Sequence, residues 1–137
     1  MVLVDTPIWS LALRRRSGDL ATRERRLTQV LYELVREGRV QLLGSTRQEV
    51  LSGIREEPQY RRIRDDLRGF VDIALTVHDY EDAARMSNEC RRSGIATTSV
   101  DMLVCAVSLR RGWQIFSTDQ DFVRYAEVIP IRMLRSD

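Results

Sequence analysis

Short apolar runs alternate with helical segments along the whole of this 137-residue chain. The clearest runs are Val2–Val4 near the start and Trp113–Phe116 near the end, each followed by polar residues that favour a turn or a helix start. Further strand-like runs are Val40–Leu43, Phe70–Val77 and Val128–Leu134. Because parallel strands need long crossover connections, strands that alternate with helices predict an α/β fold. We therefore expect a single domain over residues 1–137, with a mostly parallel central sheet and helices on both faces.

Capping and breaking residues mark where the predicted helices begin and end. Thr6 as N-cap and Pro7 at the first helical position open the first helix. Gly38, Gly94 and Gly112 each follow the end of a later helix, where glycine is a common terminator. The predicted helices cover residues 6–16, about 20–37, 46–54, 58–69, 79–92, 98–111 and 119–125.

The ionisable residues exclude several kinds of chemistry. All 22 basic residues are arginine, so a P-loop, a Schiff base and any kinase-type site that needs lysine are ruled out. The single histidine, His78, rules out two-histidine metal motifs and paired-histidine catalysis. Cys90 and Cys105 lie in predicted helices and indicate a reduced protein without a disulfide scaffold. Since there is no signal-peptide pattern and no apolar run long enough to span a bilayer, we expect a cytoplasmic protein without membrane contact.

Acidic residues follow the predicted strands or lie in the helices that come after them. Asp5 comes directly after the first strand, and Asp119 and Asp121 follow the strand at 113–116. Glu49 and Asp101 each lie in the first turn of a predicted helix. Because ligands of parallel sheets bind beyond the carboxyl ends of the strands, we expect these acids to gather along that edge.

Helix capping is a competing explanation for each acid. The stretches from Thr46 to Glu49 and from Thr98 to Asp101 both fit a capping box. An acid in the first turn also complements the helix dipole, by about 0.3–1 kcal/mol. Taken singly, Glu49 and Asp119 are therefore explained better as caps than as ligands.

Asp5 and Asp101 are harder to explain in this way. The eight residues after Asp101 are apolar or small on nearly every face, which predicts a helix buried on all sides, and Asp5 follows a strand that should be central. A desolvated acid is costly unless it is paired or bound to a metal. Oxygen-only ligands suit Mg²⁺ or Mn²⁺, and such ions activate water and neutralise charge on a phosphodiester. The residues favour a metal site, with pairing to a distant arginine as the alternative.

Four stretches of the chain match a known pattern in order and spacing. They are VLVDTPIW, RQEVLSGI, GIATTSVDMLVCAVSLRRG and WQIFSTDQDF. Together they resemble the PIN domain, and within that family the VapC-type toxins of bacterial toxin–antitoxin pairs. One departure from the family pattern is the polar stretch 97–99 before Asp101, which we interpret as a helix cap.

The resemblance implies an endoribonuclease that depends on Mg²⁺ or Mn²⁺ and hydrolyses RNA phosphodiesters. The family's catalytic and metal-binding acids match Asp5, Glu49, Asp101 and Asp119, with Asp121 as a further metal ligand. Thr6 and Thr118 match hydroxyl positions that orient these acids or the scissile phosphate. The resemblance also implies a VapB-like antitoxin as a partner and a homodimer.

Two further interpretations stay open. Arg14, Arg15 and Arg16 lie close in sequence to Asp5 and are candidates for RNA binding, or else form a solvated face that pairs with nearby acids. The alternative functions are a PIN-domain nuclease of RNA processing that is not a toxin, and a non-catalytic PIN-like module that binds RNA or protein. Retention of the matched acids argues against the non-catalytic module, and a small overlapping upstream reading frame would favour a toxin–antitoxin pair.

Overall fold

A wholly parallel sheet lies at the centre of the molecule. The structure is a computed structural model that describes residues 1–135, and its strands follow the order β2-β1-β3-β4. Val2 lies opposite Val40 on one side and opposite Gln114 on the other, which places β1 between β2 and β3. The strands are β1 (Val2–Val4), β2 (Val40–Gln41), β3 (Gln114–Phe116) and β4 (Arg132–Met133). The predicted α/β class with a parallel sheet is confirmed.

The helices connect these strands and carry local start and stop signals. Pro7 lies in the first turn of α1, and the hydroxyls of Thr76 and Thr98 cap α5 and α6 by accepting from backbone N–H groups. Gly112 ends α6 with a φ of 70°, a conformation that glycine adopts without strain. The helices are α1 (Thr6–Leu13), α2 (Thr22–Arg36), α3 (Gly44–Leu51), α4 (Glu57–Leu67), α5 (Val77–Arg92), α6 (Ser99–Arg111) and α7 (Asp121–Tyr125), with a 3₁₀ turn, η1, at Ser17–Asp19.

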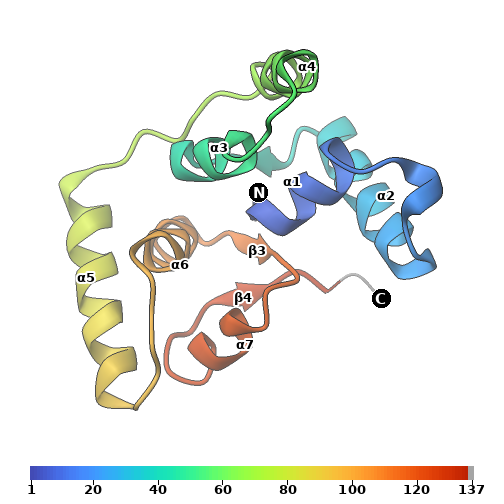
Figure 1. Cartoon of the computed structure of the whole chain (residues 1–137). Coiled ribbons are helices and arrows are strands. Elements are labelled where there is room, and N and C mark those ends of the chain that lie inside the picture. The colour runs from blue at the N-terminus through green and yellow to red at the C-terminus, as the bar shows by residue number, and fades with distance from the viewer. Residues whose placement is uncertain (136–137) are drawn as a thin grey trace.

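Two apolar cores form, one on each face of the sheet. Leu3 and Ile115 face a core completed by side chains of α5, α6 and α7. Val4 and Phe116 face the other core, which α1, α2, α3 and α4 complete. Neighbouring residues of a strand point to opposite faces, so each central strand contributes to both cores. Figure 1 shows α5, α6 and α7 gathered on one side and α1 and α2 on the other, so the prediction of helices on both faces is confirmed.

The predicted strand at 70–77 is wrong. This segment crosses from α4 to α5 and meets the sheet only at an isolated bridge between Leu42 and Asp72. The chain turns into α3 directly after Leu43, its N-cap residue, so the neighbouring edge offers no further backbone groups to pair with. The alternation that suggested a strand is real, because Ile73 and Leu75 pack on a core while Val71 is 88% exposed.

Several predicted element ends also differ from the structure. The first helix ends at Leu13, so Arg14 is its C-cap and the next two arginines lie outside it. Thr6 is the first helical residue, and Asp5 is the N-cap in its place. The capping box at Thr46 is wrong, because α3 begins at Gly44 and Glu49 therefore lies beyond its first turn.

Two further observations bear on the general expectations. Among residues 1–135, no helix is long and apolar enough to cross a membrane. Cys90 and Cys105 are both free and buried. Residues 136 and 137, the end of the predicted domain, lie outside the described residues.

Candidate active site

Asp5 lies where β1 ends and α1 begins. Its side chain is buried, with the residue 5% exposed. Its backbone N–H donates to the carbonyl of Phe116 on β3 at 2.9 Å, which continues the strand pairing by one step. The Ser117 hydroxyl donates to Asp5 Oδ2 at 2.8 Å. Strand pairing and a neighbouring hydroxyl together hold this carboxylate at the carboxyl edge of the sheet.

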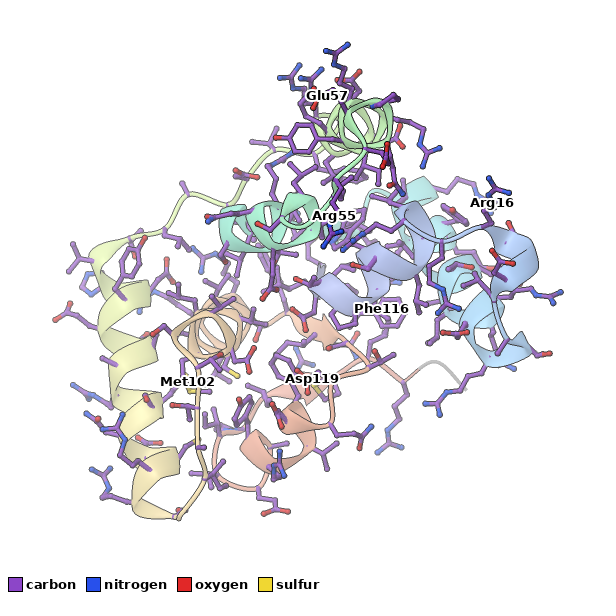
Figure 2. All side chains as sticks on the ribbon, viewed as in Figure 1. Arg16, Arg55, Glu57, Met102, Phe116 and Asp119 are labelled. Atoms are coloured by element: carbon purple, nitrogen blue, oxygen red, sulfur yellow. The ribbon has the colours of Figure 1, made fainter. Side chains whose placement is uncertain are left out.

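Three further acids form a cluster beside the same edge. Asp101, Asp119 and Asp121 each offer a carboxylate oxygen, and these oxygens lie within 4.8 Å of one another. Asp101 comes from the first turn of α6, and the other two come from the loop after β3 and the start of α7. Figure 2 shows Asp119 close to α7. We call Asp101, Asp119 and Asp121 the acid triad.

Hydroxyl and amide groups hold the triad in place. The Tyr125 hydroxyl donates to Asp101 Oδ2 at 2.7 Å, and the Asp121 N–H donates to Asp119 Oδ1 at 2.9 Å. The Asp119 N–H donates to Ser117 Oγ at 3.1 Å. Because the Ser117 hydroxyl also donates to Asp5, this serine links Asp5 to the triad.

Glu49 approaches the site from α3. It is exposed, and its Oε2 accepts a short hydrogen bond from the Thr6 hydroxyl, one residue after Asp5. Its negative charge contributes to raising the pKa of Asp5, so its carboxylate acts on the same site. Glu49 on α3 and Asp5 directly after β1 lie outside the acid triad, and Asp5 is the residue on which the charges of both Glu49 and Asp101 act.

Burial dominates the electrostatics of the two central acids. Burial raises the pKa of Asp5 to about 6, Ser117 and the Thr6 N–H oppose this, and the charges of Asp101 and Glu49 add to it. Burial also raises the pKa of Asp101, and its hydrogen bonds with the side chains of Tyr125 and Thr98 oppose this rise. The neighbouring charges of the triad raise the pKa of Asp101 further.

The donor set fits a hard divalent cation. Within residues 1–135, none of the ion pairs involves Asp5, Glu49, Asp101 or Asp119, and the cation that reaches the triad is Arg124, on Asp121. Clustered carboxylates with raised pKa values are stabilised in their charged form by a cation. Oxygen ligands favour Mg²⁺ or Mn²⁺ over zinc, whose structural sites use cysteine and histidine.

The structure adds two residues that the sequence did not single out. Ser117 follows β3 directly, one position before Thr118, which was the predicted hydroxyl and is partly buried. Tyr125 reaches Asp101 from the end of α7. The clue to Ser117 was its place directly after β3; Tyr125 carried no sequence signal, because its contact with Asp101 depends on how α7 packs.

The predicted RNA-binding arginines lie at the far end of α1 from Asp5. All three side chains, those of Arg14, Arg15 and Arg16, are exposed. The eight-residue helix α1 separates them from Asp5 by about 12 Å, at a rise of 1.5 Å per residue. They border a groove of about 930 Å³ together with residues of α2 and α4. Arg15 pairs with Glu24 at 2.8 Å, as expected for a solvated face, whereas the groove fits the interpretation as an RNA-binding surface.

The fold and site together define an α/β protein with a carboxylate cluster at the carboxyl edge of a parallel sheet. The sequence pattern of the PIN domain matches residues 2–128. The chain therefore belongs to the PIN domain family, whose members are generally nucleases. No curated protein gives a significant sequence match.

Solved structures with the same fold include a toxin–antitoxin complex. FitAcB from Neisseria gonorrhoeae aligns with a TM-score of 0.76 at 16% identity, over 99% of this chain and 98% of that one. A toxin–antitoxin complex from Klebsiella pneumoniae aligns with a TM-score of 0.66 at 20% identity, over 89% of this chain and 90% of that one. VapBC2 from Rickettsia felis, bound to a promoter DNA fragment, aligns at 0.69 and 11% identity, over 98% of each chain. At these identities the comparisons establish the shared fold.

Proposed function

We propose that this protein is a Mg²⁺- or Mn²⁺-dependent endoribonuclease and the toxin of a VapBC-type toxin–antitoxin pair. The observation that carries the proposal is the meeting of Asp5 and the acid triad at one sheet edge, linked through Ser117. Membership of the PIN family supplies the expectation of nuclease chemistry. We also propose that residues 1–137 form a single domain. We propose that the protein works in the cytoplasm, because free thiols such as its two buried cysteines are typical of a reducing compartment.

Each acid has a role in this proposal. Asp101, Asp119 and Asp121 would hold the cation, with Asp5 and Glu49 completing the set of ligands. A bound divalent ion supplies a nucleophile at neutral pH and neutralises charge on the phosphate. Ser117, Tyr125 and Thr6 orient the carboxylates of Asp5, Asp101 and Glu49 by donating hydrogen bonds, and so fix the directions of their free oxygens.

The partners follow from the same proposal. One structural neighbour is a toxin–antitoxin complex and another is VapBC2 on its promoter DNA, which supports a small VapB-like antitoxin as the partner. RNA is the proposed substrate, and Arg14, Arg15 and Arg16 are proposed to bind its backbone from the groove at the end of α1. Thr118 is proposed to act beside Ser117 in orienting the phosphate. A homodimer is proposed from the family resemblance, and sedimentation would measure it.

Metal-dependent stabilisation is the first test. Thermal unfolding is measured for the wild type, Asp101→Asn and the control Asp82→Asn, whose side chain pairs with Arg110 outside the site, each in EDTA and in Mn²⁺. Ligand at ten times its dissociation constant stabilises by about 1.4 kcal/mol, so a shift of about 5 °C is expected for the wild type and control. Asp101→Asn should show no shift.

Activity is the second arm of this test. Wild type and Asp82→Asn should cut single-stranded RNA in Mn²⁺ or Mg²⁺, and Asp101→Asn should not. Expression of the wild type should arrest growth. If the gene is preceded by a small overlapping reading frame, as expected for such a pair, co-expression of that frame should relieve the arrest. Absence of both a Mn²⁺ shift and RNA cleavage would contradict the proposal and favour a non-catalytic binding module.

A further inference from the structure

A hollow of about 400 Å³ lies directly beside the acid triad. It is lined by the loop of residues 94–98, which leads into α6, and by Asp121, Arg124 and Tyr125 of α7. Asp121 belongs to the triad itself, and Tyr125 donates to the triad member Asp101. On the loop side, the Thr98 hydroxyl accepts the Asp101 N–H at 3.1 Å. The hollow and the triad therefore share a wall, and its volume falls in the range of ligand sites.

Arg124 lines the hollow and pairs with a member of the triad. Its guanidinium donates a short hydrogen bond to Asp121 Oδ1, one helical turn earlier on α7. The Arg124 side chain is 64% exposed and that of Asp121 is 40% exposed, so the ion pair is screened and costs little to break. A divalent ion held by the triad would compete with Arg124 for this carboxylate, because both are cations that use the same oxygens. Freed from Asp121, the guanidinium would still face the hollow.

The lining indicates which part of a polynucleotide fits. Arg124 is a permanent cation whose planar donors match a phosphate. Thr97 and Thr98 also line the hollow, but their hydroxyls are already bonded, to the Ser87 hydroxyl at 2.7 Å and to the Asp101 N–H at 3.1 Å. The Tyr125 ring is 1% exposed and packs edge-on against Phe122, so it offers no open face for stacking a base. Aromatic stacking is the usual way in which single-stranded bases are held. The hollow therefore suits a sugar–phosphate unit better than a base.

We propose that this hollow binds the ribose-phosphate next to the scissile bond, and that Arg124 leaves Asp121 to bind its phosphate. This inference rests on the proposed function and deepens it by naming a substrate-binding residue and its mode of recognition. Arg124 exchanges one anion for another, so it neutralises Asp121 in the free protein and the RNA backbone in the complex. Recognition of a phosphate carries no base information, so the hollow positions RNA without selecting its sequence.

The test compares Arg124→Ala and Arg124→Lys with a matched control. Arg68→Ala is the control, because Arg68 pairs with Asp65 at the same helical spacing, is similarly exposed, and caps α4 far from α7 (Figure 1). The first readout is Mn²⁺ affinity without RNA, from thermal shift titrations. Arg124→Ala should bind Mn²⁺ about threefold more tightly than the wild type, because removing an exposed ion pair frees Asp121.

The second readout is RNA affinity. Fluorescence anisotropy follows a labelled 20-nucleotide RNA of random sequence in Ca²⁺, with the length of the RNA checked on a gel. Arg124→Ala should bind this RNA about tenfold more weakly, the effect of losing one charge-assisted hydrogen bond. Arg124→Lys keeps the charge but not the planar donors and should recover only part of the affinity, and Arg68→Ala should match the wild type in both readouts.

The opposite signs of the two effects separate this inference from general damage to the fold. A destabilised variant would lose affinity for both the ion and the RNA. If the wild type binds no Mn²⁺, the proposed function itself fails. If the wild type binds Mn²⁺ but either binds no RNA or is matched by Arg124→Ala in both affinities, the inference about the hollow is overturned alone.

Discussion

Two buried acids of this protein have pKa values shifted in opposite directions. Asp79 is fully buried and accepts two hydrogen bonds from the Arg111 guanidinium, at 2.9 and 3.1 Å, which lower its pKa to about 2. Asp5 has hydroxyl and amide donors and no ion pair within residues 1–135, and burial raises its pKa to about 6. The pairing with Arg111 thus identifies Asp79 as a stabilising residue, whereas Asp5, which has no cationic partner, is suited to binding a cation.

Asp5→Asn should stabilise the metal-free protein at neutral pH. The folded-state pKa of about 6 lies above the ordinary value of 3.8, so the wild type loses stability as the pH rises between these values. Asparagine carries no such charge and can still accept from Ser117. Urea unfolding in EDTA should show the variant ahead by about 2 kcal/mol at pH 7.5 and level with the wild type near pH 4. A difference that does not change with pH would contradict this.

Asp79→Asn should have the reverse effect. Its folded-state pKa lies below the ordinary value, so the wild type holds this stabilisation above pH 4 and loses it as the pH falls towards 2. The variant leaves Arg111 without its anionic partner and should be about 2 kcal/mol less stable at pH 7. Denaturant unfolding at pH 7 and pH 3 checks both the loss and its decline. Equal stability at pH 7 would show that the pair contributes nothing net.

At the scale of elements, the short helix α7 owes its position to two aromatic residues. Phe122 and Tyr125 are buried and contact each other edge-on, with ring centroids 5.4 Å apart. The ring of Tyr125 packs in the core while its hydroxyl reaches Asp101 at 2.7 Å. One residue therefore fixes α7 to the core and aligns a carboxylate of α6.

Tyr125→Phe separates these two roles. The ring still fills its place, so the free energy of unfolding should fall by only about 1 kcal/mol. Asp101 loses the donor that orients it, and the Mn²⁺ affinity should fall about tenfold, as for other residues that support metal ligands. Tyr80→Phe on the exposed face of α5 is the control. Unchanged Mn²⁺ affinity in Tyr125→Phe would show that the hydroxyl does not act on the site.

Elements with strong local signals were predictable from the sequence. Helix α6 carries a Thr98 cap, an apolar centre and a terminal Gly112, and the structure has all three. The segment at 70–77 failed because its alternating pattern satisfies a strand only where a neighbouring edge remains to pair with. The acid positions followed from the strand-end rule and the family resemblance. Ser117 and Tyr125 were missed because their partners are set by tertiary packing.

At the scale of the whole molecule, the two cores share their central strands. Leu3 and Ile115 belong to one core and Val4 and Phe116 to the other. Unfolding of β1 or β3 would therefore disrupt both cores at once. Each core also has its own tryptophan: Trp9 is buried in one, and Trp113 packs against the other. These positions provide two local probes of a shared structure.

The two cores should therefore unfold as one unit. In Trp9→Phe the fluorescence reports only on Trp113, and in Trp113→Phe it reports only on Trp9. For each variant, the urea midpoint from fluorescence should coincide with the midpoint from far-ultraviolet circular dichroism, as in two-state unfolding. A fluorescence midpoint that departs from the dichroism midpoint in either variant would show that one core melts independently.

The position of β1 also constrains how this protein can fold during its synthesis on the ribosome. Residues 2–4 emerge long before β3, which begins only at residue 114, yet they lie between β2 and β3. The nascent chain must therefore wait, with its first strand paired on one side at most, until most of the sequence has been translated. Asp5 and the acid triad come together over the same interval, because the triad spans residues 101–121. Synthesis of β3 and the residues that follow it thus completes the central strand and the acidic site together.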